Sequence, residues 1–405
     1  MDPRRTVDRL LEIGPRASCS DAERRAARLL ARELREAGRR PRTETVWVRP
    51  QWSWIWLLHA TLGIAASVVS VEEPVAGLVV AGVAAVSALA ELSGRVGVLS
   101  LLWPRRATQN VVSRDAREAP VRLVIAAAYD APRSMTGSLR AGARLDAAVR
   151  RLLGGRWPHP LAVVALALVA IAGCAVARLA GVESSALGAV QLVPTVACIV
   201  AVALLADAAF GRPTPGASAN ASAAAAALSL AATLDRRPPS NLAVDVVLAG
   251  ASDGLGLGLR AHVRAHRREL RPEQVAVLQL EPCGTGTPHV WSHDGPLFAL
   301  ALHPRLVALA EGIAPRHRGH GYGAYRARQA RWPAIALGAL PSRARLRDDD
   351  AEHLDVAAIR ATVEVALRLV ARLDADLADT APPEPPAPRK RPRLPALRGT
   401  SGRSA

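Results

Sequence analysis

Four long apolar runs interrupt a chain whose other segments mix apolar and charged positions. The runs span residues 54–71, 75–90, 161–182 and 186–206. Each is close to the roughly 20 residues that an α-helix needs to cross about 30 Å of hydrocarbon. They come in two pairs, and a short turn joins the members of each pair. The pattern therefore predicts two transmembrane helical hairpins, at residues 51–94 and 161–206, rather than buried core helices.

Charged residues flank the two hairpins unevenly. Arginines stand before and after each hairpin, whereas the turns inside the hairpins carry Glu72, Glu73 and Glu183. Basic residues stay on the cytoplasmic side when a helix inserts. We therefore expect a multi-pass protein of the cell membrane, in contact with the lipid bilayer. Both turns should point outward, and the soluble domain should be cytoplasmic.

The remaining segments alternate between helical and strand patterns. Apolar residues recur at helical spacing in 6–37, 221–234, 258–266 and 356–373. Strand patterns occupy 43–48, 110–112, 121–127, 242–249, 275–280 and 334–337. Such alternation predicts an α/β fold with a mostly parallel sheet flanked by helices. The soluble domain is then discontinuous, with segments 1–50, 95–160 and 207–380, and the Pro/Arg-rich segment 381–405 is predicted to be disordered.

Net charge adds little to this interpretation. The formal charge is +17, from 52 basic and 35 acidic residues. A basic chain can bind nucleic acid, but no basic stretch with interleaved aromatics and no recognition motif occurs, so we expect no nucleic-acid partner. Positive charge also suits a domain held against an anionic leaflet. The four cysteines have neither disulfide nor zinc spacing.

A series of short motifs follows in a specific order along the soluble segments. It begins with LLEIGPRASCSDAERRAARLLARELREAG at 10–38, NVV at 110–112 and LVIAAAYD at 123–130. It continues with PGASANAS at 215–222, VVLAGASD at 246–253, LQLE at 278–281, WPAIA at 332–336 and DDAEHLD at 349–355. This order resembles the co-catalytic di-zinc aminopeptidases, metallopeptidase family twenty-eight, to which aminopeptidase S and glutamate carboxypeptidase belong. The resemblance covers residues 1 to about 375 outside the hairpins and implies a zinc-exopeptidase-like fold.

The chain departs from this family at the metal site. The family binds two metals through a His, a bridging Asp, a Glu, an Asp and a final His, and a second Glu is the general base. The matching ligand positions here are Ala128, Ala219, Asp253, Glu281 and Arg345, and the base position is Ser252. Asp130, two residues after the first ligand position, is retained.

These departures predict a peptidase fold without peptidase chemistry. Asp253 and Glu281 alone are too few ligands to hold zinc tightly. Arg345 would repel a dication, and we expect it to pair with Asp253 or Glu281. Ser252 is too weak a base to activate water. The sequence thus predicts a catalytically inactive pseudopeptidase that binds a protein or peptide partner in the old cleft, with no cofactor unless a rearranged site holds zinc.

Two other functions stay open at this stage. One is an active metal-dependent hydrolase with a rearranged site built from His289, His293, His303, His317 and His320, although solvated loop histidines explain this set more simply. The other is a helical subunit of a membrane complex. A nucleotide site at the glycine-rich 254–258 is not favoured, because the third glycine and the later acidic residue of that motif are missing.

Overall fold

The computed structural model describes residues 1–134, 148, 159–319, 321–340 and 345–380. Its strands are β1 (Arg42–Val48), β2 (Arg106–Ser113), β3 (Val121–Ala128), β4 (Leu242–Ala249), β5 (Val275–Leu280), β6 (Thr287–Asp294), β7 (Leu300–Ala301), β8 (Arg316–Arg318) and β9 (Ala334–Leu340). The helices that matter for the site are α1 (Pro3–Glu12), α2 (Asp21–Glu36), α3 (Trp52–Glu72), α4 (Pro74–Leu92), α6 (Pro160–Leu179), α7 (Ser185–Phe210), α8 (Ser222–Arg236), α9 (Leu257–His266), α11 (Gly323–Gln329) and α12 (Val356–Thr380).

The strands form one mixed sheet in the order β1-β2-β4-β3-β5-β9-β6-β7, and β8 pairs with β6. The four central strands β4, β3, β5 and β9 are parallel, as the strand-helix alternation predicts. The pairs β1–β2, β2–β4, β6–β9 and β6–β7 are antiparallel. The expectation of a mostly parallel sheet is therefore wrong for the flanks. Among the antiparallel pairs only β6 and β7 follow each other through a short connection, and β1 and β2 are joined through α3 and α4, so the order of elements along the chain does not set the direction of the flanking strands.

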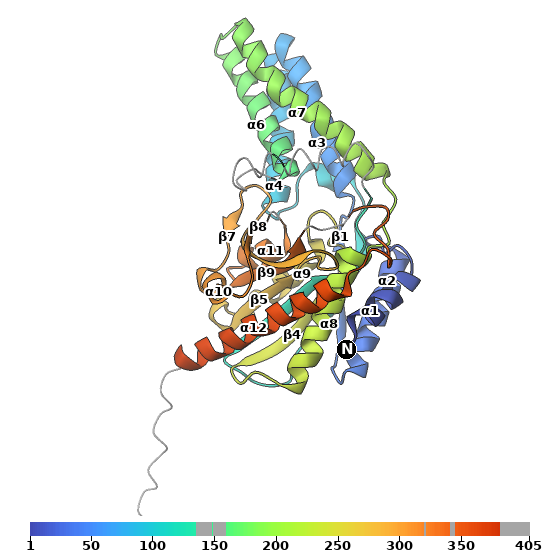
Figure 1. Ribbon diagram of the computed structural model, residues 1–405. Helices are drawn as coiled ribbons and strands as arrows, with labels where there is room; N and C mark the ends of the chain where they lie inside the picture. Colours follow the sequence, from blue (N-terminus) through green and yellow to red (C-terminus); the bar gives the residue numbers. More distant parts are fainter. Residues whose placement is uncertain (135–147, 149–158, 320, 341–344, 381–405) are drawn as a thin grey trace, which may run out of the picture.

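Helices cover both faces of the sheet. Helices α1, α2, α8 and α12 pack on one face and α9 and α11 on the other, as Figure 1 shows. All eight residues of β4 are buried, which is typical of a central strand covered on both sides. Val246 points into the first core and Val247 into the second. This double layer fixes the strand ends at which the candidate residues lie.

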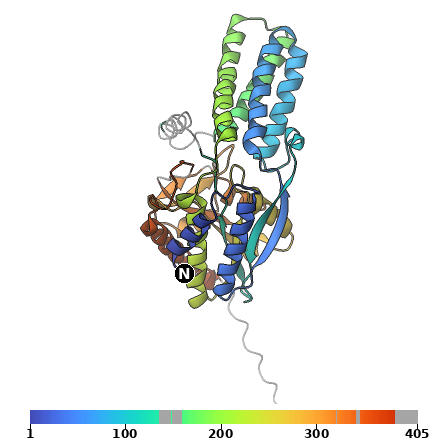
Figure 2. The ribbon, with the colours of Figure 1, turned by 90° about the vertical axis from the view of Figure 1, so that its right-hand side faces the viewer.

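The four helices α3, α4, α6 and α7 form a bundle that stands outside the sheet (Figures 1 and 2). The two hairpins thus lie side by side, although about 70 residues separate α4 from α6 in sequence. Close packing depends on small residues: a Cβ at Gly77 would lie 2.3 Å from Cβ of Ser70. Gln191 of α7 donates to the backbone oxygen of Ser67 in α3 at 2.7 Å, which joins the two hairpins.

Within the described part of the chain, five helical segments are long and apolar enough to cross a membrane, judged by length and composition. Four of them are the bundle helices, which carry large exposed apolar side chains such as Val68 and Val193. The fifth, Ala217–Arg236, includes α8 and lies in the core between the sheet and α12. Its apolar character is explained by burial inside the α/β domain.

The N-terminal segment corrects one expectation. Residues 6–37 were expected to continue as one helix, but two helices, α1 and α2, lie there. Gly14, with φ +89°, takes a left-handed conformation and Pro15 follows it, so the helix ends. The chain becomes helical again at α2, whose N-cap Ser20 accepts a hydrogen bond from the N–H of Glu23 through its hydroxyl. The break places Arg16 and Ser18 next to the strand ends.

Candidate functional site

The candidate residues gather where β4, β3 and β5 end side by side. Asp130 follows β3 by two residues, Asp253 follows β4 by four, and Glu281 comes directly after β5. A cavity of about 210 Å³ lies here, and its lining includes Ala128, Ser252, Asp253, Glu281 and Arg345. Asp130 and Ala219 are fully buried and do not line this cavity. The three carboxylates thus lie at the ends of neighbouring parallel strands, where ligands gather in open α/β sheets, but only Asp253 and Glu281 face the cavity.

Asp253 and Arg345 form an ion pair inside the cavity. The Arg345 Nη2 lies 2.6 Å from Asp253 Oδ1, and the Asp253 side chain is 6% exposed. The guanidinium also lies over the ring of Trp52, 5.5 Å from its centroid. The indole Nε1 of Trp52 donates to the other carboxylate oxygen, Oδ2, at 3.2 Å. A cation from the chain therefore stands beside the carboxylate that matches a metal ligand, as the sequence predicted.

Arg345 reaches this position with an unusual backbone. Its φ of +74° lies in the left-handed region, which is unfavourable for a residue with a Cβ. Such conformations persist where the surrounding contacts determine them. The pairing with Asp253 and the stacking on Trp52 are contacts of this kind.

Asp130 organises the turn that follows β4. Its Oδ2 accepts from the Ser18 hydroxyl at 2.7 Å and from the N–H groups of Ser252 and Asp253 at 2.9 Å each. Complete burial raises the pKa of Asp130 to about 6, although these hydrogen bonds oppose the shift. These hydrogen bonds tie the end of β3 to the turn after β4. Asp130 thus aims Asp253 into the cavity.

Three candidate positions offer no metal-binding group. Ala128 presents a methyl group to the cavity. The N–H of Ala219 donates to Oδ2 of buried Asp349 at 3.1 Å. The hydroxyl of Ser252 donates to the carbonyl of Ala249 at 3.2 Å. Among the residues that the structure describes, no group of three His, Cys, Asp or Glu ligand atoms converges on this cavity.

Glu281, the second carboxylate of the cavity, has a raised pKa. Its side chain is half-buried in the cavity wall, and desolvation together with the nearby Asp294 carboxylate raises its pKa to about 8. A protonated carboxyl group can donate a hydrogen bond to a ligand, but it is a poor ligand for a cation.

Several important residues were not identified as site residues from the sequence. The buried guanidinium of Arg16 donates to the carbonyls of Leu10, Tyr129 and Gly216, and burial lowers its pKa to about 10. Glu23 accepts from the N–H of Ala251 at 2.7 Å. Arg16 belongs to the GPR turn, and Glu23 is the third residue after the N-cap Ser20. Each residue therefore lies in a short sequence pattern that could have pointed to it.

The helical bundle supplies parts of the site as well. Trp52 begins α3, and His159, the N-cap of α6, lines the cavity. Tyr322, which lines the cavity, and Leu255 pack in one apolar cluster with residues of the bundle helices. The cavity therefore lies directly under the bundle. A resemblance to soluble enzymes carries no information on such residues.

The histidines considered for a rearranged site do not line the cavity. The rings of His289 and His317 lie 6.3 Å apart, and Arg318 Nη2 donates to His293 Nε2 at 2.9 Å. His293, His303, His289 and His317 are absent from the cavity lining among the described residues. His320 lies outside the described residues, as does the segment 381–405 that was expected to be disordered.

The sequence matches no protein-family model and no curated protein. Its fold is nevertheless similar to solved structures. A glutaminyl cyclase from Fimbriiglobus ruber aligns with a TM-score of 0.52 at 12% identity, over 92% of this chain and 94% of that one. A glutaminyl cyclase from Bacteroides thetaiotaomicron bound to N-acetylhistamine gives 0.51 at 12%, over 91% and 96%. A leucine aminopeptidase precursor from the same organism gives 0.50 at 12%, over 91% and 96%. The chain therefore has the fold that these glutaminyl cyclases and this leucine aminopeptidase precursor share.

Proposed function

We propose that this protein is a membrane-anchored pseudopeptidase. It keeps the fold of the zinc exopeptidases, lacks their hydrolytic chemistry, and binds a peptide or a protein segment in the cavity under the bundle. The observation that carries the proposal is the ion pair between Asp253 and Arg345. A guanidinium that already neutralises Asp253, one of the two carboxylates left at ligand positions, reduces the electrostatic attraction of the cavity for a dication.

The absence of several metal-binding and catalytic groups of the zinc exopeptidases supports the proposed inactivity. Zinc hydrolysis needs several protein ligands, an open position for water and a general base. Ala128 and Ala219 carry no ligand atom in their side chains, and Ser252 replaces the base. Losses within a catalytic unit are not compensated by the members that remain. We therefore place no metal in this cavity.

The outer surface of the bundle supports membrane anchoring. Apolar side chains such as Val190 and Leu192 are exposed along α7. Contact between water and an apolar surface of this kind is energetically unfavourable. At the end nearest the sheet, the rings of Trp54 and Phe210 stack edge to face with centroids 4.9 Å apart. Aromatic residues gather at the boundary between bilayer and water. The bundle is thus suited to cross the bilayer with the soluble domain against its cytoplasmic face.

The cavity is suited to a short polar ligand. Its volume of about 210 Å³ is below the range of drug-sized sites and fits one or two amino-acid residues. Two buried polar atoms in its lining, the Tyr322 hydroxyl and Gln279 Oε1, have no hydrogen-bond partner within the described part of the chain. Buried polar groups require partners. The end of a peptide would provide them.

An activity assay combined with metal analysis tests the proposed inactivity. The full chain, purified in detergent, is incubated with aminoacyl substrates bearing a fluorescent leaving group, beside an Asp253→Ala variant. We expect no hydrolysis above buffer in either protein and the same zinc content in both. Hydrolysis that disappears in Asp253→Ala together with bound zinc would establish an active enzyme and overturn the proposal.

Binding is tested with a mixture of fluorescent tripeptides whose amino termini are either free or acetylated. We expect saturable binding to the wild-type protein that weakens about tenfold in Tyr322→Phe, because one buried hydrogen bond is lost. Equal affinity of both proteins would place the peptide outside the cavity. Absence of binding to the folded wild-type protein would favour a role for the bundle alone.

A further inference from the structure

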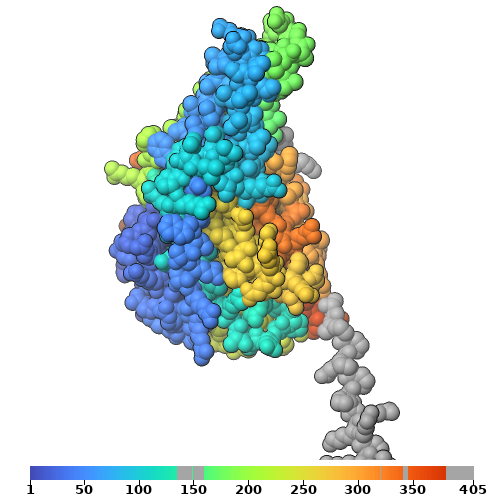
Figure 3. Space-filling view, turned by 180° about the vertical axis from the view of Figure 1, so that it is seen from behind, coloured from blue at the N-terminus to red at the C-terminus, as the bar shows by residue number. Residues whose placement is uncertain are grey.

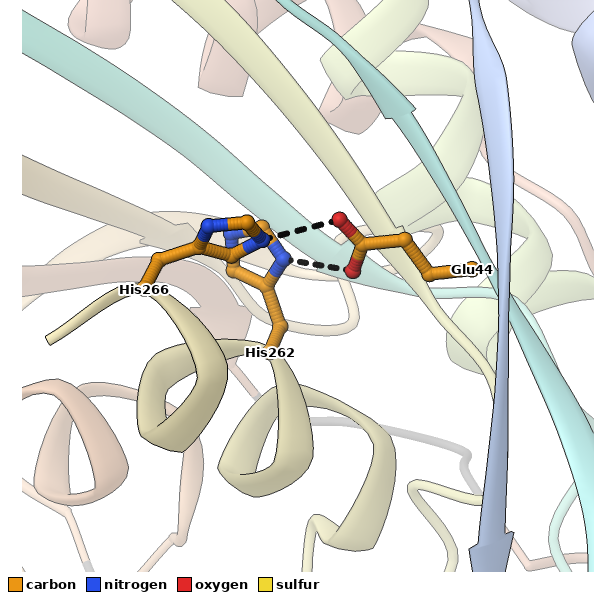
Figure 4. A group of neighbouring side chains, drawn as sticks. All are labelled: Glu44, His262 and His266. Atoms are coloured by element: carbon orange, nitrogen blue, oxygen red, sulfur yellow. Dashed lines mark hydrogen bonds and ion pairs between the residues drawn. The ribbon is translucent and has the colours of Figure 1, made fainter. Parts of the chain in front are cut away.

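A cluster of metal-ligating side chains lies between α9 and the edge strand β1. It contains none of the residues that match the metal-site positions of the family. Figure 4 shows the imidazoles of His262 and His266 pointing toward the carboxylate of Glu44. His262 Nδ1 lies 2.9 Å from Glu44 Oε2, and His266 Nε2 lies 2.9 Å from Glu44 Oε1. The three ligand atoms lie within 4.8 Å of one another.

The local structure explains why these groups meet. His262 and His266 are four residues apart on α9, so both project from the same face of the helix. Glu44 extends from the middle of β1 toward that face. On the surface seen in Figure 3, β1 (blue) lies beside α9 (yellow). Strand and helix thus hold two nitrogen donors and one carboxylate on opposite walls of one small space.

We propose that Glu44, His262 and His266 bind a divalent transition-metal ion of the zinc class. Two imidazoles and one carboxylate are a ligand set that zinc uses where a fourth position stays open. Ligand atoms about 2.1 Å from a tetrahedral ion are about 3.4 Å apart, so the present contacts need to widen by about half an ångström. The side chain of His262 is 4% exposed and that of His266 is 18% exposed, which leaves an entry path from the surface.

Glu269 provides an acceptor for the tautomer that a metal requires, although Arg114 Nη2 also lies 3.0 Å from His266 Nδ1. When an imidazole binds a metal through Nε2, its Nδ1 carries the proton and donates to an acceptor. His266 Nδ1 lies 3.0 Å from Oε2 of Glu269. Arg114 Nη2 holds the same carboxylate at 3.0 Å and so fixes its orientation. Glu269 is therefore a positioning residue for the proposed ligand His266.

The ion would connect two segments that lead to the cavity. Strand β1 runs into Trp52, which contacts Asp253, and α9 begins four residues after Asp253. Because binding stabilises only the state that holds the three ligands together, metal should stabilise the edge strand and the start of the first hairpin. This site is separate from the cavity, and it does not depend on whether the cavity binds a peptide.

The proposal is tested by zinc titration of the full chain in detergent. Any bound metal is first removed with a chelator. We expect wild-type protein to bind a single equivalent saturably, to rise in melting temperature on binding, and to give the visible spectrum of tetrahedral Co²⁺ when cobalt replaces zinc. His266→Gln should weaken binding by about 100-fold or more, and Glu269→Gln by about 10-fold. His353→Gln removes an exposed histidine elsewhere and should leave the affinity unchanged.

His266 is partly exposed, so its variant is expected to fold, and circular dichroism verifies this. Asp253→Ala should retain the zinc, which separates this site from the cavity. Equal zinc affinity in folded His266→Gln and wild type would overturn the proposal. So would the absence of saturable binding to the folded wild-type protein, since the cluster would then be an ion pair alone.

Discussion

The indole of Trp52 and the carboxylate of Asp253 are hydrogen bonded at 3.2 Å, so the first residue of the first bundle helix contacts the residue that matches a catalytic metal ligand. Gly254 makes this contact possible, because a Cβ there would lie 2.4 Å from the Trp52 ring. The hairpins are therefore not separate from the α/β domain. They complete the wall of its cavity.

Replacement of Arg345 by methionine should destabilise the protein. Asp253 is nearly buried, and loss of its cation leaves only neutral donors around its charge. We expect a loss of about 1–3 kcal/mol in the free energy of unfolding, measured as a lower melting temperature in detergent. Arg347→Met, which changes an exposed arginine two residues away, should have no effect. Equal melting temperatures for both variants would show that the ion pair has no structural role.

Stability should fall as the pH rises above about 5, because of Glu281. Its pKa is raised to about 8 in the folded protein, so the folded state binds the proton more tightly than the unfolded state does. Its contribution is then complete below the unfolded pKa of about 4.5 and is lost as the pH rises toward 8. Melting temperatures from pH 5 to 9 should decline less in Glu281→Gln than in the wild-type protein. Glu352→Gln, at an exposed position, should follow the wild-type curve.

Two glycines of α4 provide a matched test of bundle packing. A Cβ at Gly77 would lie 2.6 Å from the backbone of Ser70 in α3, whereas a Cβ at Gly82 meets nothing within 4 Å. Gly77→Ala should therefore push α4 away from α3 within the first hairpin and lower the melting temperature of the protein. Gly82→Ala should leave it unchanged or raise it slightly, since alanine favours a helix. The reverse order of the two variants would contradict this packing of α3 against α4.

Reporter fusions test the proposed membrane topology. Fusions after residues 73 and 184 should report an external location, and fusions after residues 110 and 215 an internal one. The reason is the Arg-rich flanks of both hairpins and the Glu-containing turns within them. Recovery of the full chain as a monomer from a membrane-free extract, without detergent, would contradict the anchoring itself.

Strand patterns were most informative where burial was complete. The bounds of β4 and β5 coincide with the predicted 242–249 and 275–280, because both strands are buried along their whole length. Strand β6 was not predicted. It is only partly buried and contains proline, histidines and tryptophan, so it has neither a continuous apolar run nor a clear alternation. Short strands such as β7 and β8 depend on β6 for pairing and carry no pattern of their own.

The part of the candidate site that lies at the ends of strands could be predicted from the sequence. Asp253 and Glu281 could be placed because each follows an apolar strand, and their neighbourhood follows from parallel pairing. The pairing of Arg345 with Asp253 followed from charge. The contributions of Trp52 and His159 could not be predicted, because they depend on how the bundle stands on the sheet. That arrangement is a tertiary contact without a local signal.

The position of the cavity beneath the bundle has a consequence for how a ligand would arrive. With the bundle in the bilayer, the site would lie close to the headgroups. A peptide segment attached to another protein of the same membrane would then search for it in two dimensions. Tethering of this kind raises the effective concentration of a ligand by orders of magnitude. Such a site can select its ligand with weak contacts and still be filled.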